Sequence, residues 1–344
     1  MSNVYYTSIK KNNTPANISN AVYQLVKYLV EVEAMQLERS IPLKVHFGER
    51  GNHTFVTSDY MQGIIDYLRE QNVEPYYIET NVLYKSDRTQ KDSHIKLARD
   101  HGFTQLPITI ADGDIGEDYY EVPVKQKHFK TCKIGAAFKD VSQMIVVSHF
   151  KGHIVAGFGG AIKQLSMGCA ARGGKLAMHS HALPSLKPSK CTRCGLCVDH
   201  CPGHALSLGE TIIFDRTKCT GCAACLAICP HDAIKVNWGN TEAAEFLEKL
   251  AEHALAAQKG KSCIYVNYAI KITDNCDCMD ISMQPIADDL AVMVSTDPVA
   301  IDLACMDMLD QREPKPVFGG RDIFKYAEAI GLGSMDYQLI QVVL

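Results

Sequence analysis

The sequence lacks the features of a membrane-spanning or exported chain. No stretch of its 344 residues approaches the run of about 18 apolar residues that crosses a bilayer. Residues 1–6 contain neither a basic segment followed by an apolar run nor a twin-arginine pair, so we expect no export signal. We therefore expect a cytoplasmic protein, in whose reducing surroundings the 14 cysteines do not form a disulfide framework.

Strong charge of either sign is also missing. The formal net charge is −4 at pH 7, which gives no basic surface for nucleic acid or an acidic membrane. Hydrophobic residues make up 47% of the chain and charged residues 22%, as in ordinary globular proteins. The length allows two domains, or one large domain that carries an insert.

Eight cysteines stand out because they fall in two runs with the C-x2-C-x2-C-x3-C-P spacing of bacterial-type ferredoxins. The first run contains Cys191, Cys194, Cys197 and Cys201, and the second contains Cys219, Cys222, Cys225 and Cys229. The second run starts 28 positions after the first, and neighbouring residues repeat with it, which indicates an internal duplication. We predict two [4Fe-4S] clusters, with zinc or disulfides as the alternatives.

In this duplicated arrangement, the fourth cysteine of each run ligates the other cluster. The crossed assignment gives one cluster to Cys191, Cys194, Cys197 and Cys229, and the other to Cys219, Cys222, Cys225 and Cys201. Residues 205–214, between the two runs, have the pattern of a hairpin.

An α/β pattern surrounds the cysteine runs. The expected strands are residues 3–8, 43–47, 74–79, 107–111, 144–148, 263–268 and 290–294, and the expected helices include 18–37, 58–68, 89–101 and 243–254. Alternating strands and helices indicate an α/β fold with a mostly parallel sheet flanked by helices. We expect residues 1–184 and 239–344 to form this domain, and residues 185–238 to form an inserted α+β ferredoxin-like domain with two clusters.

A second dense stretch runs from residue 149 to residue 175. Gly157, Gly159 and Gly160 lie between an expected strand and an expected helix, where glycines let the backbone approach a ligand. The free N–H groups at a helix start favour an anion, so we predict that these glycines bind a cofactor or anionic ligand. Phe158 occupies the position of the P-loop lysine, so this is not a Walker motif.

The same stretch carries side chains suited to catalysis. His149 and His153 are candidate proton donors, Lys163 and Arg172 could stabilise negative charge, and Cys169 is a further candidate. The alternative is a tight chain reversal whose histidines satisfy backbone carbonyls.

Two further segments have two interpretations each. The polar loop 79–88 is either a wall of the site or a solvated connector. Cys276 and Cys278, at C-x-C spacing, are either a third metal or redox site, completed by Cys169 and the two histidines, or small hydrophobic residues. Asp297 and the following proline match ordinary helix capping.

The whole chain resembles the iron–sulfur proteins of domain-of-unknown-function family 362. The resembling segments are residues 79–84, 107–113, 148–153, 157–163, 276–278 and 295–302. Gln164 departs from the asparagine expected there. The resemblance implies a cytoplasmic protein with two cubane clusters inserted in an α/β domain, and it implies no particular reaction.

Three functions follow. The first is a reductase that passes single electrons through the clusters to an anionic substrate or cofactor at residues 149–175. The second is an electron-transfer subunit that docks on a partner enzyme. The third is a metal- or cluster-handling protein that uses Cys169, Cys276 and Cys278. In each case we expect an electron-donor partner, such as a ferredoxin, a flavodoxin or a redox enzyme of anaerobic metabolism.

Overall fold

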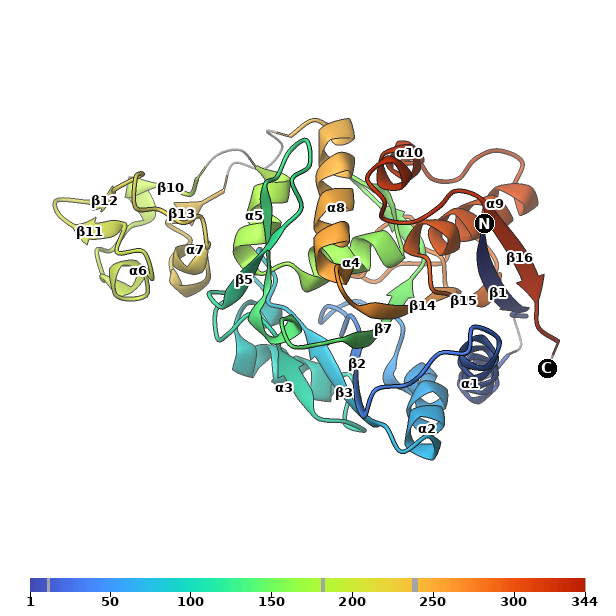
Figure 1. Ribbon diagram of the computed structural model, residues 1–344. Coiled ribbons are helices and arrows are strands. Elements are labelled where there is room, and N and C mark those ends of the chain that lie inside the picture. Colours follow the sequence, from blue (N-terminus) through green and yellow to red (C-terminus); the bar gives the residue numbers. More distant parts are fainter. Residues whose placement is uncertain (11–12, 181–182, 237–240, 344) are drawn as a thin grey trace.

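A twisted eight-stranded sheet forms the body of the molecule (Figure 1). The computed structural model describes residues 1–10, 13–180, 183–236 and 241–343. The strand order is β16-β1-β15-β14-β7-β2-β3-β4. In chain order these strands are β1 (Ser2–Ser8), β2 (Ser40–Lys44), β3 (Glu74–Glu79), β4 (Ile108–Ile110), β7 (Gln143–His149), β14 (Ser262–Ala269), β15 (Ala291–Ser295) and β16 (Tyr337–Gln341).

Five of the seven neighbouring pairs are parallel, and only β15 runs antiparallel to its two neighbours. The helices are α1 (Pro15–Val32), α2 (Gln62–Glu70), α3 (Lys91–Asp100), α4 (Ala161–Cys169), α5 (Arg172–His179), α8 (Ala243–Gln258), α9 (Pro298–Arg312) and α10 (Asp322–Ala329). The predicted α/β class, a mostly parallel sheet flanked by helices, is confirmed. None of the described helices combines the length and the apolar character that a membrane crossing requires.

Strand β7 shows why the sheet lies at the centre. All of its residues are buried, because helices cover both faces of the sheet. Met144 and Val146 join the core formed with α4, α8 and α9, whereas Ile145 and Val147 join the core formed with α1, α2 and α3. The alternation follows from the two-residue period of a strand.

Two hairpins of the α/β domain lie outside the main sheet. The first joins β5 (Tyr119–Pro123) to β6 (Thr131–Gly135), and the second joins β8 (Lys151–His153) to β9 (Gly157–Gly159). The second hairpin replaces the simple loop that the sequence predicts after β7. It brings the chain directly to the start of α4.

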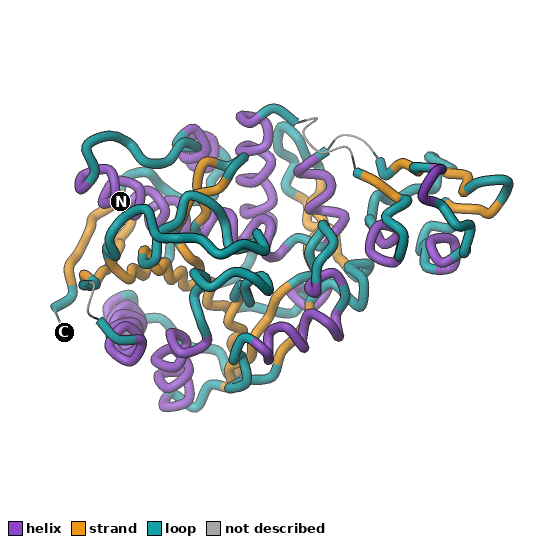
Figure 2. The backbone as a smooth tube through the Cα atoms, turned by 180° about the vertical axis from the view of Figure 1, so that it is seen from behind, coloured by secondary structure: helices purple, strands orange, loops and turns teal. Residues whose placement is uncertain are grey.

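The cysteine runs lie in a small lobe at one end of the molecule, seen in Figure 1 and from behind in Figure 2. Its elements are β10 (Ser185–Leu186), α6 (Leu196–Asp199), β11 (Leu206–Leu208), β12 (Ile212–Phe214), α7 (Ala224–Ile228) and β13 (Ile234–Lys235). The pairing of β11 with β12 confirms the predicted hairpin. We keep the boundaries at residues 184 and 238 as a proposal, and residue 238 lies outside the described residues.

Candidate functional site

Two small cavities in the lobe are each lined by four cysteines. Cys191, Cys194, Cys197 and Cys229 line one cavity, and Cys201, Cys219, Cys222 and Cys225 line the other. Each cavity therefore takes three cysteines from one run and the last cysteine from the other run. All eight cysteines are free of disulfide bonds. These donor sets fit two four-thiolate cluster sites with crossed ligation.

The duplication is also present in the backbone around the two cavities. Four residues have positive φ values of 59°, 81°, 67° and 62°, namely Arg193, Gly195, Gly221 and Ala223. The backbone N–H of Ala205 donates to Cys201 Sγ at 3.2 Å, and that of Ala233 donates to Cys229 Sγ at 3.3 Å. Hydrogen bonds of this kind stabilise cysteine thiolates and tune cluster potentials.

The second of these cavities lies next to the α/β domain. A Cβ atom on Gly173, in α5, would lie 2.9 Å from the carbonyl oxygen of Gly221 and 3.1 Å from Cys222 Cα. Ala223 packs in one apolar cluster with Leu83 of the α/β domain. The lobe therefore docks through the cysteine set that includes Cys222.

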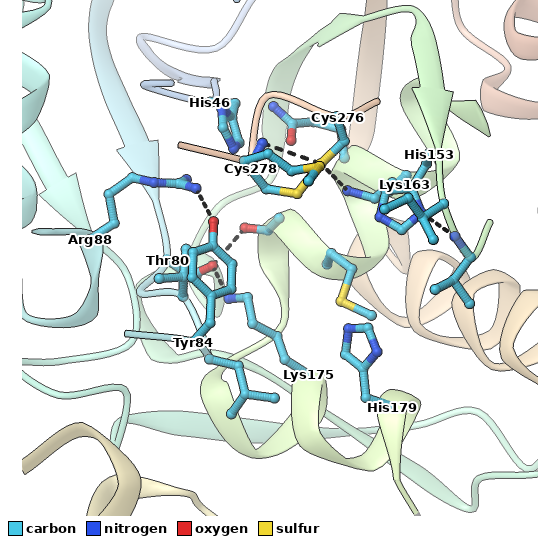
Figure 3. A pocket seen from close by; sticks show the side chains of 18 of the residues that line it. His46, Thr80, Tyr84, Arg88, His153, Lys163, Lys175, His179, Cys276 and Cys278 are labelled. Atoms are coloured by element: carbon cyan, nitrogen blue, oxygen red, sulfur yellow. Dashed lines mark hydrogen bonds between the residues drawn. A yellow bond between two sulfur atoms is a disulfide. The ribbon is translucent and has the colours of Figure 1, made fainter. Parts of the chain in front are cut away.

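A larger cavity of about 410 Å³ opens in the α/β domain beside this contact (Figure 3). Apolar residues form much of its wall, namely Val82, Leu83, Ile154, Val155, Met167, Phe246 and Met279. The other lining residues are His46, Glu79, Thr80, Tyr84, Arg88, His153, Lys163, Gln164, Gly168, Lys175, His179, Cys276 and Cys278. An apolar cavity of this volume with a few polar groups is typical of small-molecule sites.

Two of the cations at this cavity are neutralised or held by the protein. Buried Arg88 pairs with Glu49 at 3.0 Å and donates to the hydroxyl of Tyr84 at 2.6 Å. The Lys175 ammonium donates to Thr80 Oγ1 at 2.6 Å and to the carbonyl of Ala170 at 2.7 Å. Burial lowers the pKa of Lys175 to about 8. Both groups therefore hold the 79–88 loop in place.

Lys163 differs from these two cations because no oxygen of the described residues neutralises or holds its ammonium group. Its Nζ lies 3.9 Å from Cys276 Sγ, and it forms no ion pair with a carboxylate among the residues that the structure describes. Burial, together with the charge of Lys151, lowers the pKa of Lys163 to about 7. Lys163 can therefore carry a charge toward a ligand or give up a proton near neutral pH.

Two histidines are oriented by backbone N–H groups. His153 Nδ1 accepts from the N–H groups of Val155 at 3.3 Å and Ala156 at 3.0 Å, and His46 Nδ1 accepts from Gly48 at 3.0 Å. Burial lowers the pKa of both rings. A neutral ring whose Nδ1 accepts carries its proton on Nε2, so each ring is an Nε2–H donor.

Cys276 and Cys278 line the cavity and form a disulfide in this structure. Between them, buried Asp277 lies 2.9 Å from His149 Nδ1 and 3.4 Å from Lys151 Nζ. Burial alone would raise the pKa of Asp277, but these two partners lower it. Ligand atoms of His153, Cys276 and Cys278 all lie within 4.8 Å of one another, the spacing of a candidate metal site.

The structure brings together only some of the predicted site residues. His153, Lys163, Cys276 and Cys278 meet at the cavity. The predicted proton donor His149 instead holds Asp277 with Nδ1 and lies 2.8 Å from the Ile270 carbonyl with Nε2, so both ring nitrogens face protein oxygens.

Cys169 and Arg172 do not line the cavity either. Cys169 is fully buried in the core, where desolvation raises the pKa of its thiol to about 12. The Arg172 guanidinium is buried and donates to the carbonyls of Val82 and Leu83. We therefore assign Arg172 a structural role, because its guanidinium N–H groups hold the backbone of the cavity wall.

The structure also corrects the prediction that the glycine loop binds a cofactor or anionic ligand. The N–H groups of Ala161 and Ile162, at the start of α4, donate to the Asp302 carboxylate at 2.7 and 2.9 Å. The anion expected at this helix start is therefore a side chain of the protein. A Cβ atom on Gly160 would collide with Asp302, and one on Gly157 would collide with the Gly319 backbone. Close packing of the chain accounts for both of these glycines.

Gly159 lies beside the site without lining it, and His46 lines the site although it was not predicted from the sequence. A Cβ atom on Gly159 would meet the Lys163 side chain at 3.3 Å, so this glycine leaves room for that lysine. Sequence reasoning missed His46, which follows the carboxyl end of β2. That position could have indicated it, because ligands of open α/β sheets bind outside the carboxyl ends of strands. The 79–88 loop, weighed as a site wall, does line the cavity.

Comparison with known proteins identifies a family. The family described as "Domain of unknown function (DUF362)" matches residues 41–307. A Thermotoga maritima protein of known structure is 12% identical, with a TM-score of 0.44 over 87% of this chain and 59% of that one. The lactate racemase apoprotein from Thermoanaerobacterium thermosaccharolyticum is 10% identical, with a TM-score of 0.42 over 87% and 55%.

The chain thus spans little more than half the length of these two proteins. No curated protein matches the sequence significantly. The family match covers most of the chain, from β2 into α9. This protein belongs to the DUF362 family.

Proposed function

We propose that this protein is an iron–sulfur oxidoreductase that holds two [4Fe-4S] clusters beside a substrate cavity. One observation carries the proposal: the two crossed cysteine sets line two separate cavities, and Ala223, which lines one of them, packs with Leu83 of the 410 Å³ cavity wall. When bound, such clusters supply single electrons.

The lobe and its contact with the α/β domain serve the cluster sites. The N–H groups of Ala205 and Ala233 stabilise one thiolate in each set. Gly173 allows the lobe to approach α5 closely, which a side chain at that position would prevent. Leu83 belongs both to this interface and to the cavity wall. The protein therefore keeps one cluster site next to the cavity.

The cavity suits a small substrate with an apolar body and an anionic group. Lys163 supplies the positive charge, and the Nε2–H groups of His46 and His153 supply directed donors. Apolar walls exclude water, which strengthens these interactions. A cavity with such groups favours a reductase over an electron-transfer subunit, which needs only a docking surface.

Iron and sulfide analysis of the anaerobically purified protein tests the cluster assignment. We expect about eight iron and eight sulfide per chain, the content of two cubane clusters. We also expect a signal from reduced, spin-coupled clusters in electron paramagnetic resonance after treatment with dithionite. Clearly fewer iron atoms, or stoichiometric zinc in their place, would overturn the proposal.

Anion binding tests the cavity. Oxalate is a suitable probe because it is small and has no reactive group, and calorimetry measures its affinity. We expect Lys163→Met to weaken binding, because it removes the only cation at the cavity that lacks an oxygen partner among the described residues. Lys271→Met is the matched control, since Lys271 does not line the cavity. Equal affinities for both variants would contradict the substrate assignment.

A further inference from the structure

The Cys276–Cys278 pair has no part in the cluster sites, and its position is unusual for this chain. Its Cα atoms are 5.3 Å apart, within the range of ordinary disulfides, and both side chains line the cavity. The other cysteines outside the lobe are all buried in one hydrophobic core, namely Cys132, Cys169, Cys263 and Cys305. A small molecule in the cavity therefore reaches this pair and none of those four.

The two sulfur atoms are not equivalent. Cys276 is 3% exposed, and its Sγ accepts from the backbone N–H of Cys278 at 3.2 Å and faces Lys163 Nζ at 3.9 Å. Cys278 is more exposed. Donors directed at a sulfur stabilise its thiolate, so Cys276 is the better leaving group and Cys278 the accessible target.

The turn that carries the pair is held rigidly. Asp277, between the cysteines, is 1% exposed and is held by His149 at 2.9 Å and Lys151 at 3.4 Å. Because these contacts bind the intervening residue rather than the sulfurs, the disulfide can open without loss of the turn. His149 and Lys151 are thus positioning residues for the pair.

A metal fits the pair less well. The third nearby donor is His153, whose Nδ1 accepts from two backbone N–H groups. Its Nε2 then carries the proton and offers no lone pair to a metal. Metal-binding histidines show the opposite arrangement, in which the second nitrogen donates to an oxygen acceptor.

We infer that Cys276 and Cys278 form a redox-active dithiol–disulfide pair that exchanges with a small thiol or disulfide in the cavity. In one direction, a substrate thiolate attacks Cys278 Sγ, a mixed disulfide forms, and Cys276 leaves as a thiolate that is then protonated. A second substrate thiolate attacks the substrate sulfur of the mixed disulfide and releases Cys278. Two substrate thiols become one disulfide while the protein disulfide becomes two thiols, and the reverse reaction reduces a small disulfide.

The exchange needs no cluster, so its test is separate from that of the proposed function. The full-length protein, purified anaerobically, is equilibrated in buffers of reduced and oxidised dithiothreitol, quenched in acid and alkylated. Mass spectrometry of the peptide with Cys276 and Cys278 then gives the oxidised fraction. We expect one two-electron transition. Thiols that stay reduced in every buffer would overturn the inference, as would thiols whose alkylation requires prior removal of a bound metal by a chelator.

Two single variants test the asymmetry with 2-hydroxyethyl disulfide as the probe. The Cys276→Ser variant should form a mixed disulfide on Cys278. The Cys278→Ser variant should react at least about tenfold more slowly, because the remaining thiol is buried. Equal rates would contradict the assigned order of attack.

The effect of Lys163 on the Cys276 thiolate can be measured separately, through the dithiol–disulfide equilibrium. We expect Lys163→Met to shift the equilibrium about tenfold toward the disulfide, which is about 30 mV for a two-electron couple. Lys325→Met is the control, because that lysine is exposed on α10, away from the cavity. If the dithiol–disulfide equilibrium were unchanged in Lys163→Met, Lys163 would not stabilise the Cys276 thiolate.

Discussion

Asp302 connects α9 to the start of α4, and its replacement by asparagine gives a quantitative test of how the cavity is built. Oδ1 accepts from Ala161 N–H and from Asn267 Nδ2, both at 2.7 Å, and Oδ2 accepts from Ile162 N–H at 2.9 Å. The carboxylate is fully buried, and desolvation raises its pKa to about 6. At about pH 8 it is therefore ionised.

The side-chain amide of the Asp302→Asn variant would have only one acceptor oxygen, so at least one N–H group at the start of α4 loses its partner. An unsatisfied buried donor costs about 1–3 kcal/mol. Loss of the negative charge at a helix N-terminus adds about 0.3–1 kcal/mol. We expect Asp302→Asn to lower the free energy of opening this helix start by about 1.3–4 kcal/mol, combining these two effects.

Amide hydrogen exchange measures this opening without global unfolding. A loss of about 1.3–4 kcal/mol corresponds to exchange that is about 9- to 900-fold faster, at 1.36 kcal/mol per factor of ten. The readout is the peptide that covers Ala161 and Ile162. Asp307→Asn is the matched control, because Asp307 lies on the same helix and contacts Tyr337 instead. Exchange that changes less than about threefold in Asp302→Asn would refute the proposed anchoring.

Three further predictions concern the cavity and the lobe. Oxalate binding should be strong below about pH 7 and should weaken as the pH rises through the pKa of Lys163, because the lysine then loses its positive charge. Calorimetry at a series of pH values measures the affinity. An affinity that does not change with pH would contradict the prediction. Arg88→Met should lower the free energy of unfolding by about 3–5 kcal/mol, because it leaves the buried Glu49 carboxylate without its cation; thermal or denaturant unfolding measures the loss. Gly173→Leu should loosen the contact between α5 and the lobe and speed limited proteolysis of the lobe, whereas Gly319→Leu, where the added Cβ meets no atom within 4 Å, should not.

Much of the fold, and the grouping of the cysteines into two sets, could be predicted from local sequence patterns. The continuous apolar run of β7 indicated a strand with both faces covered, and every residue of β7 is buried in the structure. Cysteine spacing within each run is also local, and the duplication made the crossed grouping predictable. The two cavities then group the cysteines in that way.

The parts that the sequence could not indicate depend on distant partners. Asp302 lies 141 residues after Ala161, so nothing near the glycine loop showed that a carboxylate of the chain already occupies the helix start. His149 and Asp277 are 128 residues apart, and only the fold shows that this histidine holds a turn. A histidine or glycine in a suggestive motif has many possible partners, and packing selects among them.

The most direct test of the central claim is which cysteines a bound cluster protects from alkylation. In the anaerobically purified Cys229→Ala variant, alkylation followed by mass spectrometry reports each thiol of both runs. Crossed ligation predicts that Cys191, Cys194 and Cys197 become reactive, while Cys219, Cys222 and Cys225 stay protected. If the second set became reactive and the first stayed protected, or if all six were already reactive in the unaltered protein, the account of the cluster sites would be contradicted.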